Sequence, residues 1–280
     1  MLERRHIQRI VDMALDEDAP FGDLTGQTLV PATATATADL VAREPGVFAG
    51  AEVFEVAMTT LDPAVTVTMK AADGDRFGRG TVLATVSGPA RAVLQAERVA
   101  LNLVQRMTGI ATLTATYVEA VAGTNARVVD TRKTTPGLRA LERHAVRCGG
   151  GHNHRYSLSD AVMAKDNHLA VIDDLTTALK QAKADLPHTT HIEVEVDRLD
   201  QIDAVLASGA ADTIMLDNFS LEDLRAGVAQ IGDQALVEAS GGITLDTIAD
   251  VAATGVDIIS VGALTHSVRA LDLGLDITVS

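Results

Sequence analysis

Hydrophobic and polar residues change their spacing along the chain, and these changes predict where helices and strands lie. In residues 1–18 the apolar side chains recur at intervals of three and four, the spacing of a helix with one buried face. From residue 32 apolar and polar residues alternate in the run ATATATADLVA, and the same alternation returns at 65–70. Alternation with period two is typical of half-exposed strands in an antiparallel sheet. We also expect a short helix over 51–61 and a strand over 81–86.

A long helical pattern follows this sheet-forming region. Residues 91–107 place their apolar side chains on one stripe, whereas Arg98 and Asn102, four positions apart, lie together on the other side. We expect this helix to end before Gly109 and a second helix to cover roughly 110–122.

Strands and helices then alternate up to residue 261. Six short, mostly apolar stretches are predicted strands: 126–130, 161–165, 191–196, 212–217, 235–239 and 257–261. The helical patterns between them include 174–184, 199–208, 221–230 and 244–253. Near-continuous apolar strands at this spacing indicate buried parallel strands in βαβ units.

Polar or glycine residues stand at the C-terminal end of each of these strands. They are Thr131 with Arg132 and Lys133, Lys165, Glu195, Asp217, Ser240 with Gly241, and Gly262. In a doubly wound sheet only the loops at the switch point converge, whereas in a barrel every loop can reach one central site. We therefore predict an α/β protein whose second part is an incomplete parallel α/β barrel of about six βα units.

The distribution of charge adds a candidate site to this picture. The chain carries 23 Lys and Arg against 38 Asp and Glu, a formal net charge of −15. Residues 127–165 reverse the balance, because three acidic residues there stand against eight basic ones: Arg127, Arg132, Lys133, Arg139, Arg143, Arg147, Arg155 and Lys165. Such a basic patch, with histidines beside it, indicates a site for a small, highly charged anion. The acidic balance and the scarcity of aromatic residues (no Trp, two Tyr, five Phe) argue against nucleic-acid binding.

The chain has a single cysteine, Cys148, so no intrachain disulfide can form. The N-terminal helix pattern lacks the apolar core of a signal peptide, and no apolar run approaches the roughly 20 residues that cross a bilayer. We therefore expect a soluble protein in a reducing, cytoplasmic setting without membrane contact. Cys148 precedes three glycines, and such a lone thiol is more often a packing residue than a nucleophile. His152 and His154 share a face of an extended segment, but they lack the cysteine partner or helical spacing that a zinc site uses.

Glycines at two neighbouring strand ends indicate a phosphate site. Ser240, Gly241 and Gly242 follow a strand and open a helix, and Gly262 with Ala263 repeats the arrangement on the next strand. Glycine lets backbone N–H groups approach an anion, and a helix N-terminus favours negative charge. The alternative is that these glycines only allow tight turns.

Two carboxylates indicate a cationic partner. Glu193 and Glu195 lie two positions apart on one predicted strand and therefore face the same side. A buried carboxylate is costly unless it is paired or binds a metal, so Glu195 with Asp217 suggests a divalent cation or a developing cation as partner. A salt bridge from Glu195 to Lys133 or Lys165 is the competing explanation, and the two are compatible.

An ordered set of motifs makes the sequence resemble a known family. The motifs are DEDAPFGDLT, ERVALN, DTRKT, PGLR, GGGHNHR, KDNH, EVEV, LDNF, SGG and VGALTHS. In this order, over nearly the full chain, they are similar to quinolinate phosphoribosyltransferase, also called nicotinate-nucleotide pyrophosphorylase (carboxylating). Tyr156-Ser157 and Ala164 depart from the pattern, which has a Leu-Gly-like pair and a larger apolar residue there.

The resemblance implies transfer of a phosphoribosyl group from phosphoribosyl pyrophosphate to quinolinate. Carbon dioxide and pyrophosphate would be lost, giving nicotinate mononucleotide for NAD biosynthesis. The resemblance also implies an N-terminal α/β sandwich domain, 1–108, which residues 268–280 rejoin, and an open barrel domain, 109–267. The expected partners are the two substrates and a second copy of the chain, in a homodimer with a shared site or a higher oligomer.

The same resemblance implies roles for individual residues. For the quinolinate carboxylates it gives Arg132, His154, Arg155 and Lys165, with Arg98 from the partner subunit; Thr131 is a further substrate-binding residue. Lys133 would lie near the pyrophosphate, Glu195 and Asp217 would hold Mg²⁺ and the ribose, and the 5′-phosphate would be held by Ser240, Gly241 and Gly262. The residues expected to act in catalysis are Lys133, Lys165, Glu195 and Asp217.

Two other functions fit parts of the sequence. The paralogous ModD-like proteins, linked to molybdate uptake, share DTRKT and HR but not KDNH, so Lys165 and His168 favour the biosynthetic enzyme. A non-catalytic sugar-phosphate-binding barrel would keep Ser240 and the glycines after it. It would have no need for Glu195 and Asp217.

Overall fold

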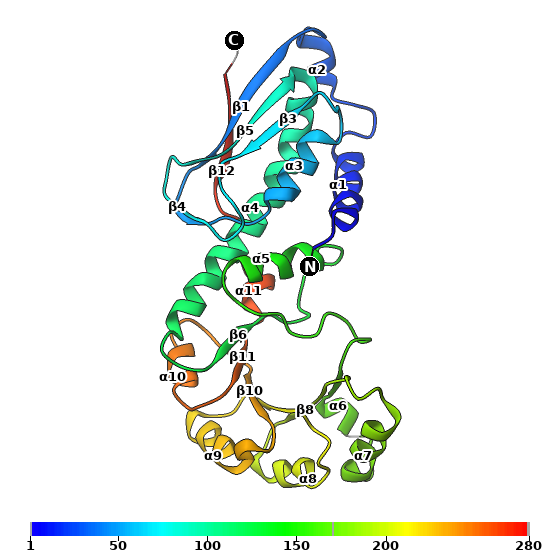
Figure 1. The fold of residues 1–280 in the computed structure, drawn as a ribbon, viewed down its shortest axis with the longest axis vertical. Helices are drawn as coiled ribbons and strands as arrows, with labels where there is room; N and C mark the ends of the chain where they lie inside the picture. Colours follow the sequence, from blue (N-terminus) through cyan, green and yellow to red (C-terminus); the bar gives the residue numbers. More distant parts are fainter. Residues whose placement is uncertain (1, 170, 279–280) are drawn as a thin grey trace. The chain divides into compact units, whose positions relative to one another are not determined.

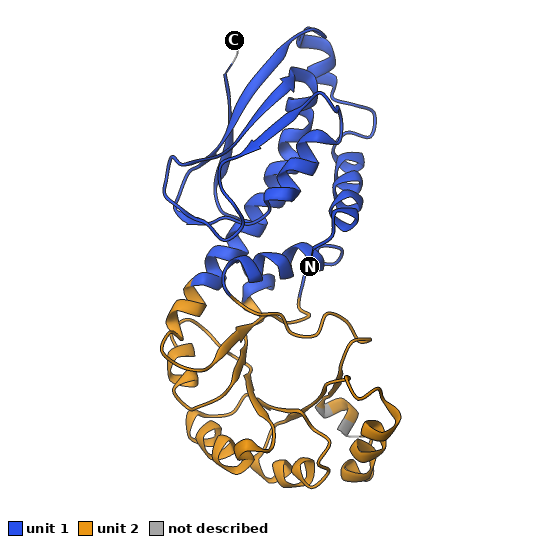
Figure 2. Cartoon of the chain, in the orientation of Figure 1, with its two compact units in different colours: residues 1–115, 134–150, 264–280 blue, residues 116–133, 151–263 orange. Residues whose placement is uncertain are grey.

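The computed structural model describes residues 2–169 and 171–278. The chain forms two compact units, shown in Figure 2. Unit 1 comprises 1–115, 134–150 and 264–280, and unit 2 comprises 116–133 and 151–263. The boundary between independent domains that we expect after residue 108 stays a prediction. Within the described part of the chain, no helix is long and apolar enough to cross a membrane.

Unit 1 contains an antiparallel sheet formed by the alternating segments. Its strand order is β12-β1-β5-β3, with β1 Thr35–Ala42, β3 Thr66–Met69, β5 Val82–Pro89 and β12 Leu273–Thr278 (Figure 1). Every second residue of β1 is buried, as the alternation predicts. β12 comes from the far end of the sequence and pairs with β1 from Ala42–Leu273 to Thr37–Thr278. The short strands β2 Gly46–Val47 and β4 Arg76–Phe77 pair separately.

Of three helices in unit 1, α1 and α3 lie in predicted segments and α2 was not predicted. α1 Arg4–Asp18 buries one stripe, made of Ile7, Ile10, Val11 and Leu15. α2 Leu24–Leu29 starts at Asp23, whose carboxylate accepts hydrogen bonds from the backbone N–H groups of Thr25 and Gly26. α3 Ala51–Thr59 contacts both α1 and β3, so the two helices and the sheet share one apolar core.

The two helices expected at 91–107 and 110–122 are one continuous helix, α4 Ala90–Ala120, so that prediction was wrong. Gly109 does not end the helix. A Cβ placed on Gly109 would lie 2.2 Å from the carbonyl oxygen of Arg269, so the glycine allows a close approach of another backbone segment. One interior glycine costs a helix roughly 1 kcal/mol, which this packing offsets.

Unit 2 contains the six predicted parallel strands. They are β6 Arg127–Val129, β7 Val162–Ala164, β8 Ile192–Val196, β9 Thr213–Asp217, β10 Leu236–Ser240 and β11 Ile258–Ser260. They lie in the order β6-β11-β10-β9-β8-β7, and no pairing of β6 with β7 closes the sheet among the described residues. The predicted incomplete α/β barrel, with a separate antiparallel sheet, is confirmed.

Helices follow the strands and lie outside them in Figure 1. They are α6 Asp166–Leu169, α7 Leu175–Asp185, η1 Leu199–Gln201 with α8 Ile202–Leu206, α9 Leu221–Ile231 with η2 Gly232–Gln234, and α10 Ile248–Ala252. α10 is shorter than the predicted 244–253, because Thr244 to Thr247 form a turn in which the Thr247 hydroxyl accepts the Thr244 N–H at 3.0 Å. The helices α5 Arg139–Cys148 and α11 Ala263–His266 were not predicted.

Candidate active site

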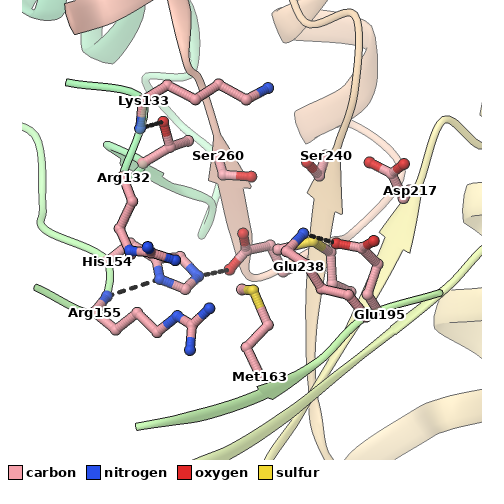
Figure 3. A pocket seen from close by; sticks show the side chains of 13 residues that line it. Arg132, Lys133, His154, Arg155, Met163, Glu195, Asp217, Glu238, Ser240 and Ser260 are labelled. Carbon is pink, nitrogen blue, oxygen red and sulfur yellow. Dashed lines mark hydrogen bonds and ion pairs between the residues drawn. The ribbon is translucent and has the colours of Figure 1, made fainter. Parts of the chain in front are cut away.

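A cavity of about 420 Å³ opens at the C-terminal ends of the strands in unit 2 (Figure 3). Every strand of the parallel sheet, or the loop after it, contributes to its wall. The lining residues are Thr131, Arg132, Lys133, His154, Arg155, Met163, Lys165, Glu195, Met215, Asp217, Glu238, Ser240 and Ser260. Most of the predicted site residues are therefore gathered in one place.

The pleat of the strands explains why these side chains share a cavity. On β9 the lining residues Met215 and Asp217 are two positions apart, and on β10 Glu238 and Ser240 repeat that spacing. The parallel register places Glu195 beside Met215 and Ser240 beside Asp217. Because successive side chains of a strand point to opposite faces, every second residue of neighbouring strands faces the same cavity.

A buried carboxylate fixes the cationic wall of the cavity. Asp130 is 0% exposed, and its Oδ1 accepts the backbone N–H of His154 at 2.8 Å. Its Oδ2 accepts a hydrogen bond from the side-chain amide of Asn153 at 2.6 Å. These bonds tie the HNHR segment to the end of β6. Arg132, His154 and Arg155 consequently reach the cavity from one side, as Figure 3 shows.

His154 lies between two buried glutamates. Its Nε2 is 3.0 Å from Oε2 of Glu193 and 3.6 Å from Oε2 of Glu238. Burial by itself lowers the pKa of His154, but the hydrogen bonds to Glu193 and then to Glu238 outweigh it and raise that pKa to about 10. Burial also raises the pKa of Glu193, although His154 counteracts this effect.

One contact of the His154 ring favours the opposite protonation state. The backbone N–H of Arg155 lies 2.7 Å from Nδ1, which suits a neutral imidazole with its proton on Nε2. The attraction between buried opposite charges exceeds the strength of one neutral hydrogen bond, so the two carboxylates decide the state. His154 is therefore a cation at neutral pH and belongs to the positive wall with Arg132 and Arg155.

The other wall carries the carboxylates of Glu195 and Asp217. Glu195 forms an ion pair with Lys165, whose ammonium group approaches Oε2. Of the two lysines considered as its partner, Lys165 is the one in contact. Lys133 also lines the cavity, and its backbone N–H donates to the hydroxyl of Thr131 at 3.1 Å. The predicted salt bridge of Glu195 is therefore present, with Lys165 as its partner. Metal binding by Glu195 would be a second role of the same carboxylate.

Of the residues predicted to bind the 5′-phosphate, one lines the cavity and the others lie outside it. Ser240 lines the cavity and also a neighbouring hollow of about 280 Å³, which Gly241 and Gly242 share. Gly241 has a φ of 90°, and a Cβ there would lie 2.1 Å from Oδ1 of Asn218, so only glycine fits. Gly262 follows β11 and lines neither space.

Arg98 is the predicted site residue that lies in unit 1. It is on α4, its side chain is exposed, and it is not among the residues that line the cavity. The expected contribution of Arg98 to a substrate site stays a prediction.

Four lining residues were missed by sequence reasoning: Met163, Met215, Glu238 and Ser260. Glu238 could have been found, because it stands two positions before Ser240 on the same strand and so shares its face. Oε1 of Glu193, Oε1 of Glu238 and the hydroxyl of Ser260 are buried and have no hydrogen-bond partner among the described residues. Glu238 and Ser260 line the cavity, so these two side chains have free capacity for polar atoms of a ligand.

Known proteins resemble the chain over nearly its whole length. The family described as Quinolinate phosphoribosyl transferase matches with its N-terminal domain over residues 23–108 and with its C-terminal domain over 110–276. Nicotinate-nucleotide pyrophosphorylase [carboxylating] of Mycobacterium leprae is 47% identical, over 94% of this chain and 94% of its own. A probable enzyme of the same name from Bacillus subtilis is 42% identical, over 98% and 94%.

Solved structures agree with these sequence relatives. NadC from Streptococcus pyogenes superposes with a TM-score of 0.95 at 40% identity, covering 100% of this chain and 99% of that one. The nicotinate-nucleotide pyrophosphorylase from Francisella tularensis gives a TM-score of 0.93 at 36% identity, covering 99% and 98%. An open α/β barrel with facing cationic and acidic walls, together with these relatives, defines a phosphoribosyltransferase. The chain belongs to the quinolinate phosphoribosyltransferase family, as its ordered motifs predicted.

Proposed function

We propose that this protein transfers the phosphoribosyl group of phosphoribosyl pyrophosphate to quinolinate and releases pyrophosphate and carbon dioxide. The product would be nicotinate mononucleotide. The observation that carries the proposal is the single cavity in which a cationic wall, formed by Arg132, His154 and Arg155, faces the carboxylates of Glu195 and Asp217. A dianionic acceptor and a sugar that develops positive charge need these two environments side by side.

The cationic wall suits a planar dicarboxylate. Guanidinium groups recognise carboxylates in a planar, bidentate manner, and the wall carries two of them, on Arg132 and Arg155. His154 adds a third positive charge that the glutamates beside it maintain. Lys165 is a fourth cation at the cavity, and its pairing with Glu195 would place it between the two substrates.

The acidic wall suits the sugar. When the bond between the ribose C1′ and the pyrophosphate oxygen breaks, positive charge develops at C1′, and the carboxylates of Glu195 and Asp217 would stabilise it. The pyridine nitrogen then forms the new bond to C1′. Lys133, on the same cavity, is the expected counter-charge for the departing pyrophosphate.

The donor set of this wall also fits Mg²⁺, because two carboxylates at neighbouring strand ends offer the hard oxygen ligands this ion prefers. Bound there by Glu195 and Asp217, Mg²⁺ would neutralise charge on the pyrophosphate. The 5′-phosphate is assigned to Ser240 and Gly241, which line the hollow beside the cavity, and the family resemblance adds Gly262.

Decarboxylation requires no further group of the protein. After transfer the ring nitrogen is positively charged and lies next to the carbon that bears the departing carboxylate. The electrons of the breaking C–C bond can therefore move toward the pyridinium, and a proton replaces the lost carbon dioxide. The protein mainly has to hold the dicarboxylate in place, which is consistent with a cavity dominated by charged side chains.

Formation of the product from quinolinate, phosphoribosyl pyrophosphate and Mg²⁺ is the direct test. Purified protein should release labelled carbon dioxide from quinolinate in proportion to pyrophosphate formed, and Arg132→Ala should lose this activity. Turnover of nicotinate in place of quinolinate, with no carbon dioxide, would refute the assigned substrate.

The active enzyme is proposed to be a homodimer, or a higher oligomer built from it, in which Arg98 completes the site of the partner subunit. Two features of unit 1 support this. Arg98 is exposed, and the region around α2 exposes large apolar side chains, with Phe21 93%, Leu24 76% and Leu29 75% accessible. A folded monomer rarely leaves such residues together in water.

Mixing two inactive variants tests the shared site. Arg98→Ala and Lys165→Ala homodimers should each be inactive, whereas subunits exchanged between them should regain up to about a quarter of wild-type activity, because one site in a hybrid keeps both residues. The absence of any recovery after verified exchange would contradict a shared site. The cytoplasmic location proposed from the single cysteine is checked separately by cell fractionation.

A further inference from the structure

A second group of ionisable side chains lies in unit 1, among residues that the proposed reaction does not use. His144 and Cys148 are four positions apart on α5 and therefore lie on one face of the helix. Nε2 of His144 is 2.6 Å from Oδ2 of Asp73. One donor atom from each of Asp73, His144 and Cys148 lies within 4.8 Å of the other two.

The loop that carries Asp73 is held in a fixed position. Oδ1 of Asp73 accepts the backbone N–H groups of Gly50 at 2.7 Å and Ala51 at 2.9 Å, at the start of α3. The backbone N–H of Gly74 donates to the carbonyl of Phe48 at 2.9 Å. One carboxylate oxygen is thus anchored, and the other is aimed at His144. Metal ligands are typically oriented in this way by hydrogen bonds to their second atom.

We propose that Asp73, His144 and Cys148 form a zinc site with one position left for solvent. Zinc is commonly bound by a thiolate, an imidazole and a carboxylate, and a three-residue site keeps a fourth, open position. The metal would link the loop between β3 and β4 to α5. The proposal goes beyond the phosphoribosyl transfer and does not depend on it.

The geometry requires little rearrangement. Zinc bonds of about 2.0–2.3 Å in a tetrahedron place neighbouring donors about 3.5 Å apart. The distance between Oδ2 of Asp73 and Nε2 of His144 would increase by about 1 Å when the ion replaces the proton between them. The sulfur of Cys148 already lies within 4.8 Å of both atoms, so it would need only a small movement. The side chains of His144 and Asp73 are 29% and 27% exposed, so an ion can enter from solvent.

Binding should become tighter as pH rises, because a thiol must lose its proton before its sulfur can bind zinc.

Cobalt(II) is a sharp probe because Cys148 is the only thiol in the chain. Full-length protein, stripped with a chelator, should bind one Co²⁺ per chain and show a thiolate-to-cobalt charge-transfer band in the near ultraviolet. Zn²⁺ should abolish the band by competition. Cobalt bound at Glu195 and Asp217 gives no such band, so the Mg²⁺ assignment and this proposal are tested separately.

Matched variants decide the result. Cys148→Ser should lose the band. Asp73→Asn and His144→Ala should each weaken Co²⁺ binding at least about tenfold, because loss of even an outer-shell partner typically costs about 10–100-fold in metal affinity. His188→Ala, which alters an exposed histidine, is the control and should bind as the wild type does. Absence of the band in folded wild-type protein would overturn the proposal, as would a band that persists unchanged in both Asp73→Asn and His144→Ala.

Discussion

Replacing Arg106 by methionine tests an ion pair in unit 1 whose carboxylate is buried, while the arginine side chain is 29% exposed. Arg106, on α4, donates from Nε to Oε1 of Glu142 at 2.7 Å. Its Nη2 donates to the hydroxyl of Thr135 at 2.7 Å and to the carbonyl of Thr265 at 2.9 Å. Glu142 is 1% exposed, and its Oε2 accepts the backbone N–H of Thr135 at 3.1 Å. One guanidinium therefore joins α4, α5, α11 and the segment just after Lys133.

The size of the effect follows from this burial. Arg106→Met leaves the carboxylate of Glu142 inside the unit without its cation, and breaking one partner of a buried pair costs roughly 3–5 kcal/mol. That is a large share of the roughly 5–15 kcal/mol by which a domain is typically stable. The double variant Arg106→Met/Glu142→Leu removes both charges and should regain most of the loss. A residual loss of about 1–2 kcal/mol is expected from the acceptors on Thr135 and Thr265.

Urea unfolding followed by circular dichroism, at one protein concentration for all variants, measures these free energies. Arg43→Met is the control, because its pair with Asp276 is exposed and should contribute little. If Arg106→Met and Arg43→Met lowered the free energy of unfolding equally, the burial of Glu142 would not be what makes its ion pair important. A double variant no more stable than Arg106→Met would refute the charge argument itself.

Two further predictions concern a pKa and a glycine. The pKa of His154 is raised from 6.5 to about 10, so its charged ring stabilises the fold fully below pH 6.5, and this contribution is lost as pH rises toward 10. We therefore expect the free energy of unfolding, measured with urea at several pH values between 6.5 and 10, to fall less for His154→Gln than for the wild type. An equal fall with pH for the two proteins would contradict the raised pKa of His154. Gly109→Ala should improve intrinsic helix propensity and still lower the melting temperature, because its Cβ would meet the carbonyl of Arg269, an overpacking cost of roughly 1–3 kcal/mol. Gly78→Ala, whose Cβ would meet nothing within 4 Å, is the control, and an equal melting temperature for the two variants would show that α4 adjusts freely.

The strands and the wall of the cavity were predictable because they depend on local spacing. A period of two decides which residues of a strand face inward, and the polar ends of parallel strands meet at one edge, so Glu195, Asp217 and Ser240 could be grouped from sequence. The same spacing could have included Glu238, which was overlooked.

Other features depend on residues far away in the sequence. Gly109 resembles a helix break, and only the approach of Arg269 explains why a glycine stands inside a continuous helix. The choice between Lys133 and Lys165 as partner of Glu195 depends on where two loops fold back, which no local pattern encodes. The amphipathic helix α5 was missed because its buried stripe is short and includes the charged Glu142 beside Leu141, Ala145 and Val146.

The pairing of β12 with β1 has a practical consequence for work on separate pieces of this protein. β1 lies between β12 and β5, and β12 is supplied by residues 273–278. A fragment that stops at residue 108 would lose this neighbour and present the backbone donors and acceptors of β1 to solvent. Open strand edges of this kind recruit other chains, so such a fragment should aggregate unless a peptide carrying the β12 sequence is supplied with it.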